Sequence, residues 1–159
     1  MRLIRSISLV LAGGLLLAGC GGTAPSGAVA AADRLLDAAR DGDRAAFEAG
    51  IDRAALREDV RRQLVSAARA SALEVDGGPS EFALDRMISP QAVRRVAAEA
   101  QAETDLRGHM RALGTNRACL GGSLVGGDCL LTFGRGDGGW RLVGLRARDL
   151  GVEMAASRP

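Results

Sequence analysis

Residues 129–146, CLLTFGRGDGGWRLVGLR, contain two short apolar, β-prone runs on either side of a glycine-rich turn. The turn, Gly136-Asp137-Gly138-Gly139, is typical of a chain reversal between antiparallel strands. We therefore predict a hairpin with strands over Cys129–Arg135 and Trp140–Arg146. A weaker run, Cys119–Val125, predicts a third strand.

The sequence before Gly114 is different, because its apolar residues recur with the period of an α-helix. A first helix should run from Val29 and end at Gly42, which can adopt the left-handed conformation. Asp43 should cap a short helix that contains Phe47.

Asp52 is placed to cap a longer helix over about residues 54–73. Its buried stripe should consist of Leu56, Val60, Leu64 and Ala67 or Ala68, and Glu58 and Arg62 should pair across one turn.

Two serines mark further helix starts. Ser80 should cap a short helix holding Phe82 and Met87, and Ser89-Pro90 should begin a longer helix that continues through Met110 and Leu113 to Gly114. The sequence thus predicts an α+β domain with about five N-terminal helices, two of them short, packed on a small C-terminal antiparallel sheet of about three strands. Because aromatic residues are few, Leu, Val and Ala should fill its core.

The N-terminus has the organisation of an export signal. Arg2 and Arg5 precede an apolar run over residues 7–18, which as a helix would span about 18 Å, less than the hydrocarbon core of about 30 Å. The run ends in Leu17-Ala18-Gly19-Cys20, which resembles the lipobox of bacterial lipoproteins. This resemblance implies that residues 1–19 are removed and that Cys20 becomes the lipid-bearing (palmitate) first residue of the mature protein. An ordinary secretory signal is the alternative.

Export and anchoring predict a location and a division of the chain. We expect a tether over residues 20–27, one domain over residues 28–150 and a tail over residues 151–159. Gly21, in place of Asp, resembles the pattern of lipoproteins sent to the outer membrane, where the domain would face the periplasm.

The net charge of +2 belongs to the export signal. Arg2 and Arg5 account for the whole excess of basic over acidic residues, so the mature chain is formally neutral. Nucleic-acid binding requires a cationic footprint, and we expect no nucleic-acid partner.

Cys119 and Cys129 should form a disulfide, because export places them in an oxidising compartment. Closing a loop of about 11 residues stabilises a fold by about 2–3 kcal/mol. A metal site with His109 as third ligand is the alternative, but the cysteines lack the close spacing of metal-binding pairs. We therefore expect neither a metal nor a cofactor.

We find no catalytic constellation in the sequence. His109, the only histidine, has no Ser or Cys motif placed to use it as a base. The glycines at 134, 136 and 139 match a dinucleotide fingerprint formally, but a strand rather than a helix should follow them. The same turn contains an adhesion-like Arg135-Gly136-Asp137, which chance explains better. Arg61-Arg62 and Arg94-Arg95 should lie on solvated helix faces.

Several short segments resemble one family. They are Gly42-Asp43, Ile51-Asp52, Leu56-Arg57, Met87-Ile88-Ser89-Pro90 and Trp140-Arg141-Leu142-Val143. The family is a proteobacterial one of unknown function, found in small secreted or membrane-anchored proteins, and the resemblance extends over about residues 30–148. Arg53, where members tend to have an aromatic residue, and the cysteine pair depart from it. The resemblance implies a fold but no functional residues.

These observations predict a noncatalytic envelope lipoprotein, held at the membrane by its lipid, that binds an envelope protein or has a structural role. The alternative is a small-molecule-binding domain with an apolar pocket between sheet and helices, lined by Phe133 and Val143. An enzyme is the least favoured of the three.

Overall fold

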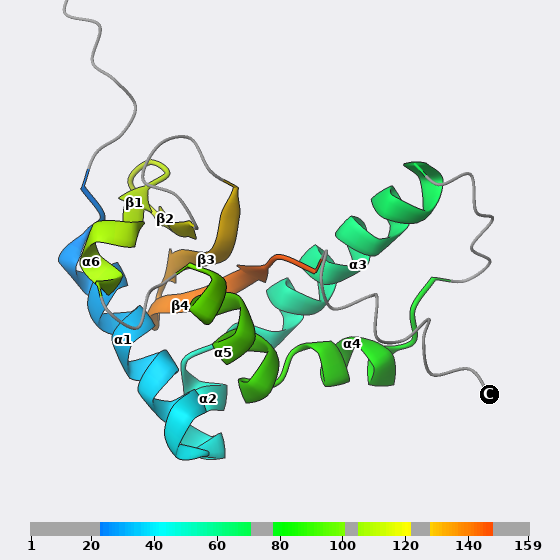
Figure 1. Cartoon of the computed structure of the whole chain (residues 1–159), viewed down its shortest axis with the longest axis horizontal. Coiled ribbons are helices and arrows are strands. Elements are labelled where there is room, and N and C mark those ends of the chain that lie inside the picture. Colours follow the sequence, from blue (N-terminus) through cyan, green and yellow to red (C-terminus); the bar gives the residue numbers. More distant parts are fainter. Residues whose placement is uncertain (1–22, 71–77, 101–104, 122–127, 148–159) are drawn as a thin grey trace, which may run out of the picture.

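A computed structural model describes residues 23–70, 78–100, 105–121 and 128–147. Within these ranges six helices come first along the chain and a four-stranded antiparallel sheet follows (Figure 1). This confirms the α+β class, with one helix and one strand more than expected. The predicted export signal, Cys20 and the predicted tail over residues 151–159 lie outside the described residues.

Local capping sets the end of α1 and the starts of α2 and α3 as predicted, whereas α1 starts at Ser26, three residues before the expected Val29. α1 (Ser26–Asp41) stops at Gly42, whose φ of 74° is left-handed. Asp43 accepts a hydrogen bond from the Ala46 amide (3.0 Å) and so caps α2 (Arg44–Ala49). Asp52 does the same for α3 (Arg53–Ala70) through Ala55 (3.0 Å). Because α1 starts at Ser26, the last two residues of the expected tether belong to this helix.

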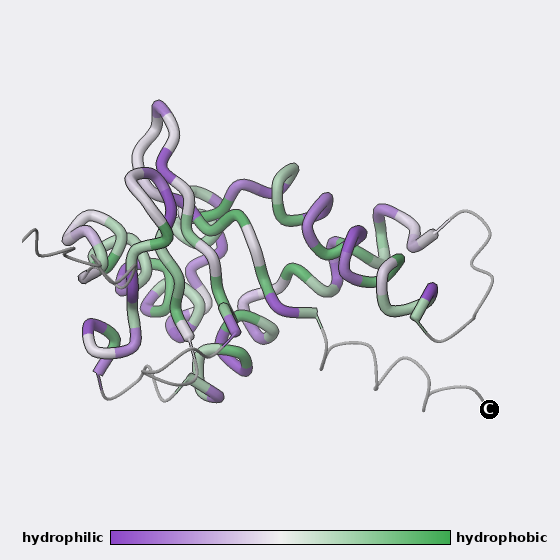
Figure 2. Tube along the Cα trace, turned by 90° about the horizontal axis from the view of Figure 1, so that it is seen from above, coloured by the Kyte–Doolittle hydropathy of each residue, from purple (hydrophilic) through white to green (hydrophobic). Residues whose placement is uncertain are grey.

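The buried stripe of α3 is shorter than predicted. Leu56 and Val60 are fully buried and Leu64 is partly buried, but of the two alanines expected to continue the stripe, Ala67 is exposed and Ala68 is only partly buried. Figures 1 and 2 show why: the second half of α3 extends past the sheet. The expected end of this helix near residue 73 lies outside the described residues.

Two serine caps are confirmed. Ser80 accepts a hydrogen bond from Ala83 (3.2 Å) at the start of α4 (Glu81–Met87). Ser89 accepts one from Ala92 (3.2 Å) at the start of α5 (Pro90–Glu99).

The expected long helix from Ser89 to Leu113 is wrong in its last part. α5 ends at Glu99, and Asp105 caps a separate one-turn helix, α6 (Leu106–His109). Met110 then begins strand β1 (Met110–Ala112), which pairs with β2 (Arg117–Gly121). Pairing with a distant strand has overridden a helical pattern, since such patterns set only a weak local preference.

The hairpin at the end of the fold is confirmed. β3 (Cys129–Gly136) and β4 (Gly139–Leu145) pair antiparallel, and Gly139 has the positive φ (94°) that the turn requires. The strand order is β1-β2-β3-β4. The predicted third strand is β2, although its expected end at 122–125 lies outside the described residues.

The core lies between the sheet and the helices α1 and α5, which contact β3 and β4. Its largest fully buried side chains are Phe47 and Phe133, and the remainder is aliphatic or alanine apart from Met87, Met110 and Cys119. The prediction of a core filled by Leu, Val and Ala is therefore confirmed. No described helix is both long and apolar enough to cross a bilayer.

The outer edge of β4 is covered by the chain around Ile51 rather than by another strand of the sheet. The Asp52 amide donates to the carbonyl of Leu142 (2.8 Å), and the Leu142 amide donates to the carbonyl of Gly50 (3.0 Å). This short parallel bridge satisfies backbone groups that an edge strand would otherwise leave unpaired.

Two side chains of α3 continue this cover along the edge. Asp59 accepts a hydrogen bond from the Leu145 amide (3.2 Å), and Gln63 donates to the Leu145 carbonyl (2.9 Å). Gln63 also accepts from the Ala147 amide (2.9 Å) and donates to Asp59 (2.7 Å). One face of α3 thus replaces a missing neighbouring strand.

Candidate functional site

The cysteine pair forms a disulfide between β2 and β3. The Cα atoms of Cys119 and Cys129 are 5.4 Å apart. Cysteines bonded to each other offer no thiolate to a metal, and the described residues contain no group of three metal-binding side chains. His109 is the last residue of α6. The predicted disulfide is therefore present, and it joins the weaker strand to the stronger one.

An ion-pair network joins α3 to α4. Arg57 donates two hydrogen bonds to the carboxylate of Asp85, Nε to Oδ1 and Nη2 to Oδ2, both 2.7 Å long. Arg53 adds a third at 3.1 Å and also pairs with Glu48. Hydrogen bonding from Arg57 holds the pKa of Asp85 below its ordinary value, and the same bond raises the pKa of Arg57. Arg57 thus has a structural partner.

The arginine pairs of the sequence are distributed over helix surfaces, as expected. Arg61 pairs with Glu58 (3.0 Å) and with Glu81 of α4. Arg62 pairs with Asp59 (3.1 Å) and lies within 3.7 Å of Glu58, as the spacing predicted.

One hollow lies among the helices, and we name it the helical cleft. It has a volume of about 890 Å³, and its walls come from α1, α2, the first residue of α3, α4, α5 and the chain between them. Phe82 lines it with 72% of its surface exposed, although the described fold buries most of its large apolar side chains. The guanidinium of Arg86 lies 5.9 Å from the centre of the Phe82 ring, within cation–π distance.

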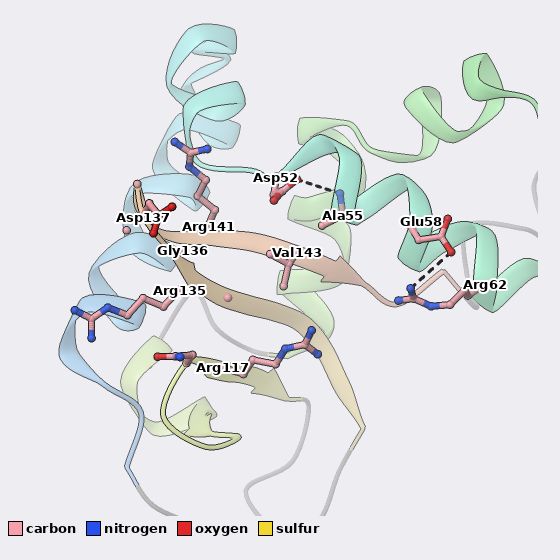
Figure 3. A pocket seen from close by; sticks show the side chains of 14 residues that line it. Asp52, Ala55, Glu58, Arg62, Arg117, Arg135, Gly136, Asp137, Arg141 and Val143 are labelled. Carbon is pink, nitrogen blue, oxygen red and sulfur yellow. Dashed lines mark hydrogen bonds and ion pairs between the residues drawn. The ribbon is translucent and has the colours of Figure 1, made fainter.

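A second hollow, the sheet groove, lies between the first half of α3 and the strands β2, β3 and β4 (Figure 3). Its volume is about 580 Å³. The charged residues that line it are Asp52, Glu58, Arg62, Arg117, Arg135, Asp137 and Arg141.

Val143 contributes an apolar side chain to the lining of the sheet groove. A Cβ on Gly134 would lie 3.1 Å from Cγ1 of Val143, so the valine occupies space that the glycine leaves open. Phe133, by contrast, is fully buried in the core. The structure therefore does not bring Phe133 and Val143 together around one pocket, as the small-molecule alternative expected.

The glycines of the dinucleotide-like pattern lie in the β3–β4 hairpin, and the residues after Gly139 form a strand. The fingerprint requires a helix to begin directly after the glycines so that its N-terminus binds pyrophosphate, whereas here β4 follows them. The hollows instead offer guanidinium, carboxylate and apolar groups, which suit the binding of charged or apolar partners.

The sequence did not predict three features: the hydrogen bonds from Asp59 and Gln63 to the edge of β4, the ion pair between Arg57 and Asp85, and the arginines that line the sheet groove. Asp59 and Gln63 are four residues apart and so share a helix face, which is a signal that could have suggested joint action. Nothing local connects Arg57 with Asp85, or Arg117 with Arg141.

The fold and its hollows define a small α+β domain with one helical half and one sheet half. The chain belongs to DUF2939, a family described as proteins of unknown function, which matches residues 16–104. The match covers α1 to α5 and ends before the strands. Neither the curated proteins nor the solved structures provide a significant match.

Family membership confirms the expected domain of unknown function. The resembling segments from Gly42 to Pro90 lie inside the matched residues, and they are largely helix caps and helix ends. The resembling segment Trp140–Val143 lies beyond them.

Proposed function

We propose that this protein is a noncatalytic lipoprotein of the cell envelope, whose domain binds a partner protein at the membrane surface. In this proposal residues 1–19 are an export signal and Cys20 carries the lipid. The membrane is the outer one, and the domain faces the periplasm. A single acyl chain binds membranes only marginally, so stable anchoring requires the two or more chains of a mature lipoprotein.

The position of the first described residue supports this proposal. Thr23 pairs with Arg111 of β1, and only two residues separate it from Cys20. Since an extended chain covers at most about 3.6 Å per residue, Cys20 lies within about 11 Å of Thr23. A lipid on Cys20 would therefore hold the domain directly against the bilayer.

The exposure of Phe82 is the observation that carries the partner-binding role. Aromatic and arginine side chains are enriched in protein–protein interfaces relative to the rest of the surface, and here Phe82 and Arg86 lie together at the helical cleft. All residues that line this cleft, from Ala39 to Arg94, fall within the part that matches the family.

The alternative, a small-molecule site between sheet and helices, has less support. Phe133, Leu131 and Leu142 fill the space it would need and are fully buried.

The anchor is tested by metabolic labelling with palmitate and by membrane fractionation. Cys20→Ala should abolish both the label and the membrane association. An unchanged palmitate signal in this variant would reject lipidation at Cys20.

The partner surface is tested by photocrosslinking in intact envelopes. A photoreactive amino acid at position 82 should give a discrete crosslinked product, whereas the same group at Ala98, an exposed position on α5, should not. Equal products at both positions, or none at position 82, would reject the cleft as the binding surface.

A further inference from the structure

The two turns of the sheet that the structure describes, between β1 and β2 and between β3 and β4, lie at the same end of it. Arg117 at the start of β2 is opposite Gly134 near the end of β3, and the Arg135 amide donates to the carbonyl of Asn116 in the β1–β2 turn (2.9 Å). We call this region the basic end; it comprises the turn at 113–116, the turn at 137–138, and Arg117, Arg135 and Arg141.

The three arginines give the basic end a surplus of positive charge. Within the described residues, none of them has an ion-pair partner. Of the other acids that line the groove, Glu58 pairs with Arg61 and Asp52 lies at the N-terminus of α3, where it accepts the Ala55 amide. Asp137 remains as the single opposing charge in the turn. The mature chain is neutral as a whole, so this surplus is a local feature.

Two of the arginines share a row across three strands. Arg117, Gly134 and Arg141 lie directly opposite one another in the pairing of β2, β3 and β4. Directly opposed residues project from the same face, and one intervening strand separates the arginine Cα atoms by about 10 Å. Gly134, between them, has no side chain, and the side chain nearest to it is the uncharged Val143, whereas the Arg141 guanidinium lies over Gly138 of the turn. Arg117 and Arg141 thus both line the sheet groove (Figure 3). Guanidinium groups bind phosphate oxygens in a bidentate manner.

The basic end also presents an apolar side chain. Leu113, in the β1–β2 turn, is 44% exposed. An apolar residue beside several arginines is typical of surfaces that lie in the headgroup region of a bilayer.

The chain enters the fold at this same end. A Cβ on Gly27, in the first turn of α1, would lie 3.0 Å from the Trp140 ring, and Trp140 is opposite Arg135 in the hairpin. The segment that leads to Cys20 therefore starts beside the basic end, and an anchored domain would have this surface within reach of the headgroups.

We propose that the basic end binds the phosphate groups of anionic phospholipids in the membrane that holds the protein, and so fixes the orientation of the domain. The identity of that membrane rests on the proposed function, but the binding surface does not. Bound in this way, the domain would direct the helical cleft, which lies on other elements, toward a partner.

The test uses the mature chain, residues 20–159, with Cys20→Ser, so that binding reports the protein surface and not the lipid. Cosedimentation is measured with phosphatidylcholine vesicles that contain or lack phosphatidylglycerol. Binding should require phosphatidylglycerol. Each arginine near an anionic surface contributes about fivefold to partitioning, so the triple variant Arg117→Gln, Arg135→Gln, Arg141→Gln should bind on the order of 100-fold more weakly.

The matched control removes the same charge elsewhere, through Arg40→Gln, Arg44→Gln and Arg94→Gln in the helical cleft. It should retain most of the binding, and all variants should melt at the wild-type temperature. Equal losses in both triple variants, or binding indifferent to phosphatidylglycerol, would overturn the proposal. So would release by inorganic phosphate but not by chloride of the same ionic strength, because the site would then take a free anion. If the protein binds phosphatidylglycerol but is not labelled with palmitate in cells, lipidation of Cys20 is rejected, while binding by the basic end is still supported.

Discussion

The helices between Ser26 and Glu99 are closed by residues only a few positions away, whereas the strands between Met110 and Leu145 depend on distant parts of the chain. Asp43, Asp52, Ser80 and Ser89 each cap a helix through an amide three residues on. The edge of β4, by contrast, is completed by Asp59 and Gln63, which are more than 80 positions away.

This difference indicates how the sheet half gains its stability. Its strands are short and rich in glycine, and short two-stranded ribbons are marginal on their own. A disulfide, a buried phenylalanine and one face of α3 supply what the local sequence lacks. The sheet half should therefore respond more strongly than the helical half to loss of its long-range contacts.

The largest effect should come from the core of the sheet. Phe133→Ala removes a fully buried ring from β3 and should lower the free energy of unfolding by about 3–5 kcal/mol. Phe82→Ala, at a position 72% exposed, should change it by less than about 0.5 kcal/mol. Urea denaturation followed by circular dichroism measures both. If both variants lose a similar free energy of unfolding, Phe82 is buried in solution. The helical cleft would then have no exposed aromatic side chain with which to bind a partner.

The disulfide should contribute the next largest effect. Replacing Cys119 and Cys129 with alanine releases a loop whose ends are 10 positions apart and should cost about 2–3 kcal/mol. The wild-type protein in a reducing agent should show the same loss, measured again by urea denaturation. If reduction leaves the unfolding midpoint unchanged, the strands do not depend on this link.

Loss of the contact between α3 and the edge of β4 should lower the free energy of unfolding by less than loss of the disulfide does. Gln63→Ala leaves the Leu145 carbonyl and the Ala147 amide without their side-chain partner, and unsatisfied backbone groups of this kind cost about 1–3 kcal/mol. Hydrogen exchange should accelerate at β4 more than in α1. Ser66→Ala, at an exposed site on the same helix, is the control, and equal exchange in both variants would show that α3 does not support the sheet edge.

The same contrast explains what the sequence allowed us to predict. Helix starts at Asp43, Asp52, Ser80 and Ser89 were correctly placed because each signal and its target lie within one turn. The β3–β4 hairpin was correctly placed because its turn residues adjoin both strands. The cysteine pair could be joined because it was the only one left after Cys20.

What escaped prediction depends on partners that local patterns do not reveal. Met110 was placed in a helix because its spacing fits one, but its partner is Leu120 in β2. The burial of α3 was overestimated because the sheet ends beside the middle of that helix. The candidate basic end joins residues of β2, β3 and β4, and only the register of the sheet brings Arg117 and Arg141 into one row.

The smallest effect should come from the ion pairs that hold α4 on α3, and it should depend on pH. Because Arg57 holds the pKa of Asp85 below its ordinary value of 3.8, the charged carboxylate stabilises the folded state at neutral pH. Asp85→Asn should therefore lower the melting temperature at pH 7, by less than loss of the disulfide does. This difference from wild type should shrink as the pH falls below 3.8, where wild-type Asp85 also becomes protonated. Asp37→Asn, which breaks an exposed pair within α1, is the control and should change the melting temperature less, since exposed pairs contribute little. A difference for Asp85→Asn that persisted in acid would mean that packing, and not charge, joins the two helices.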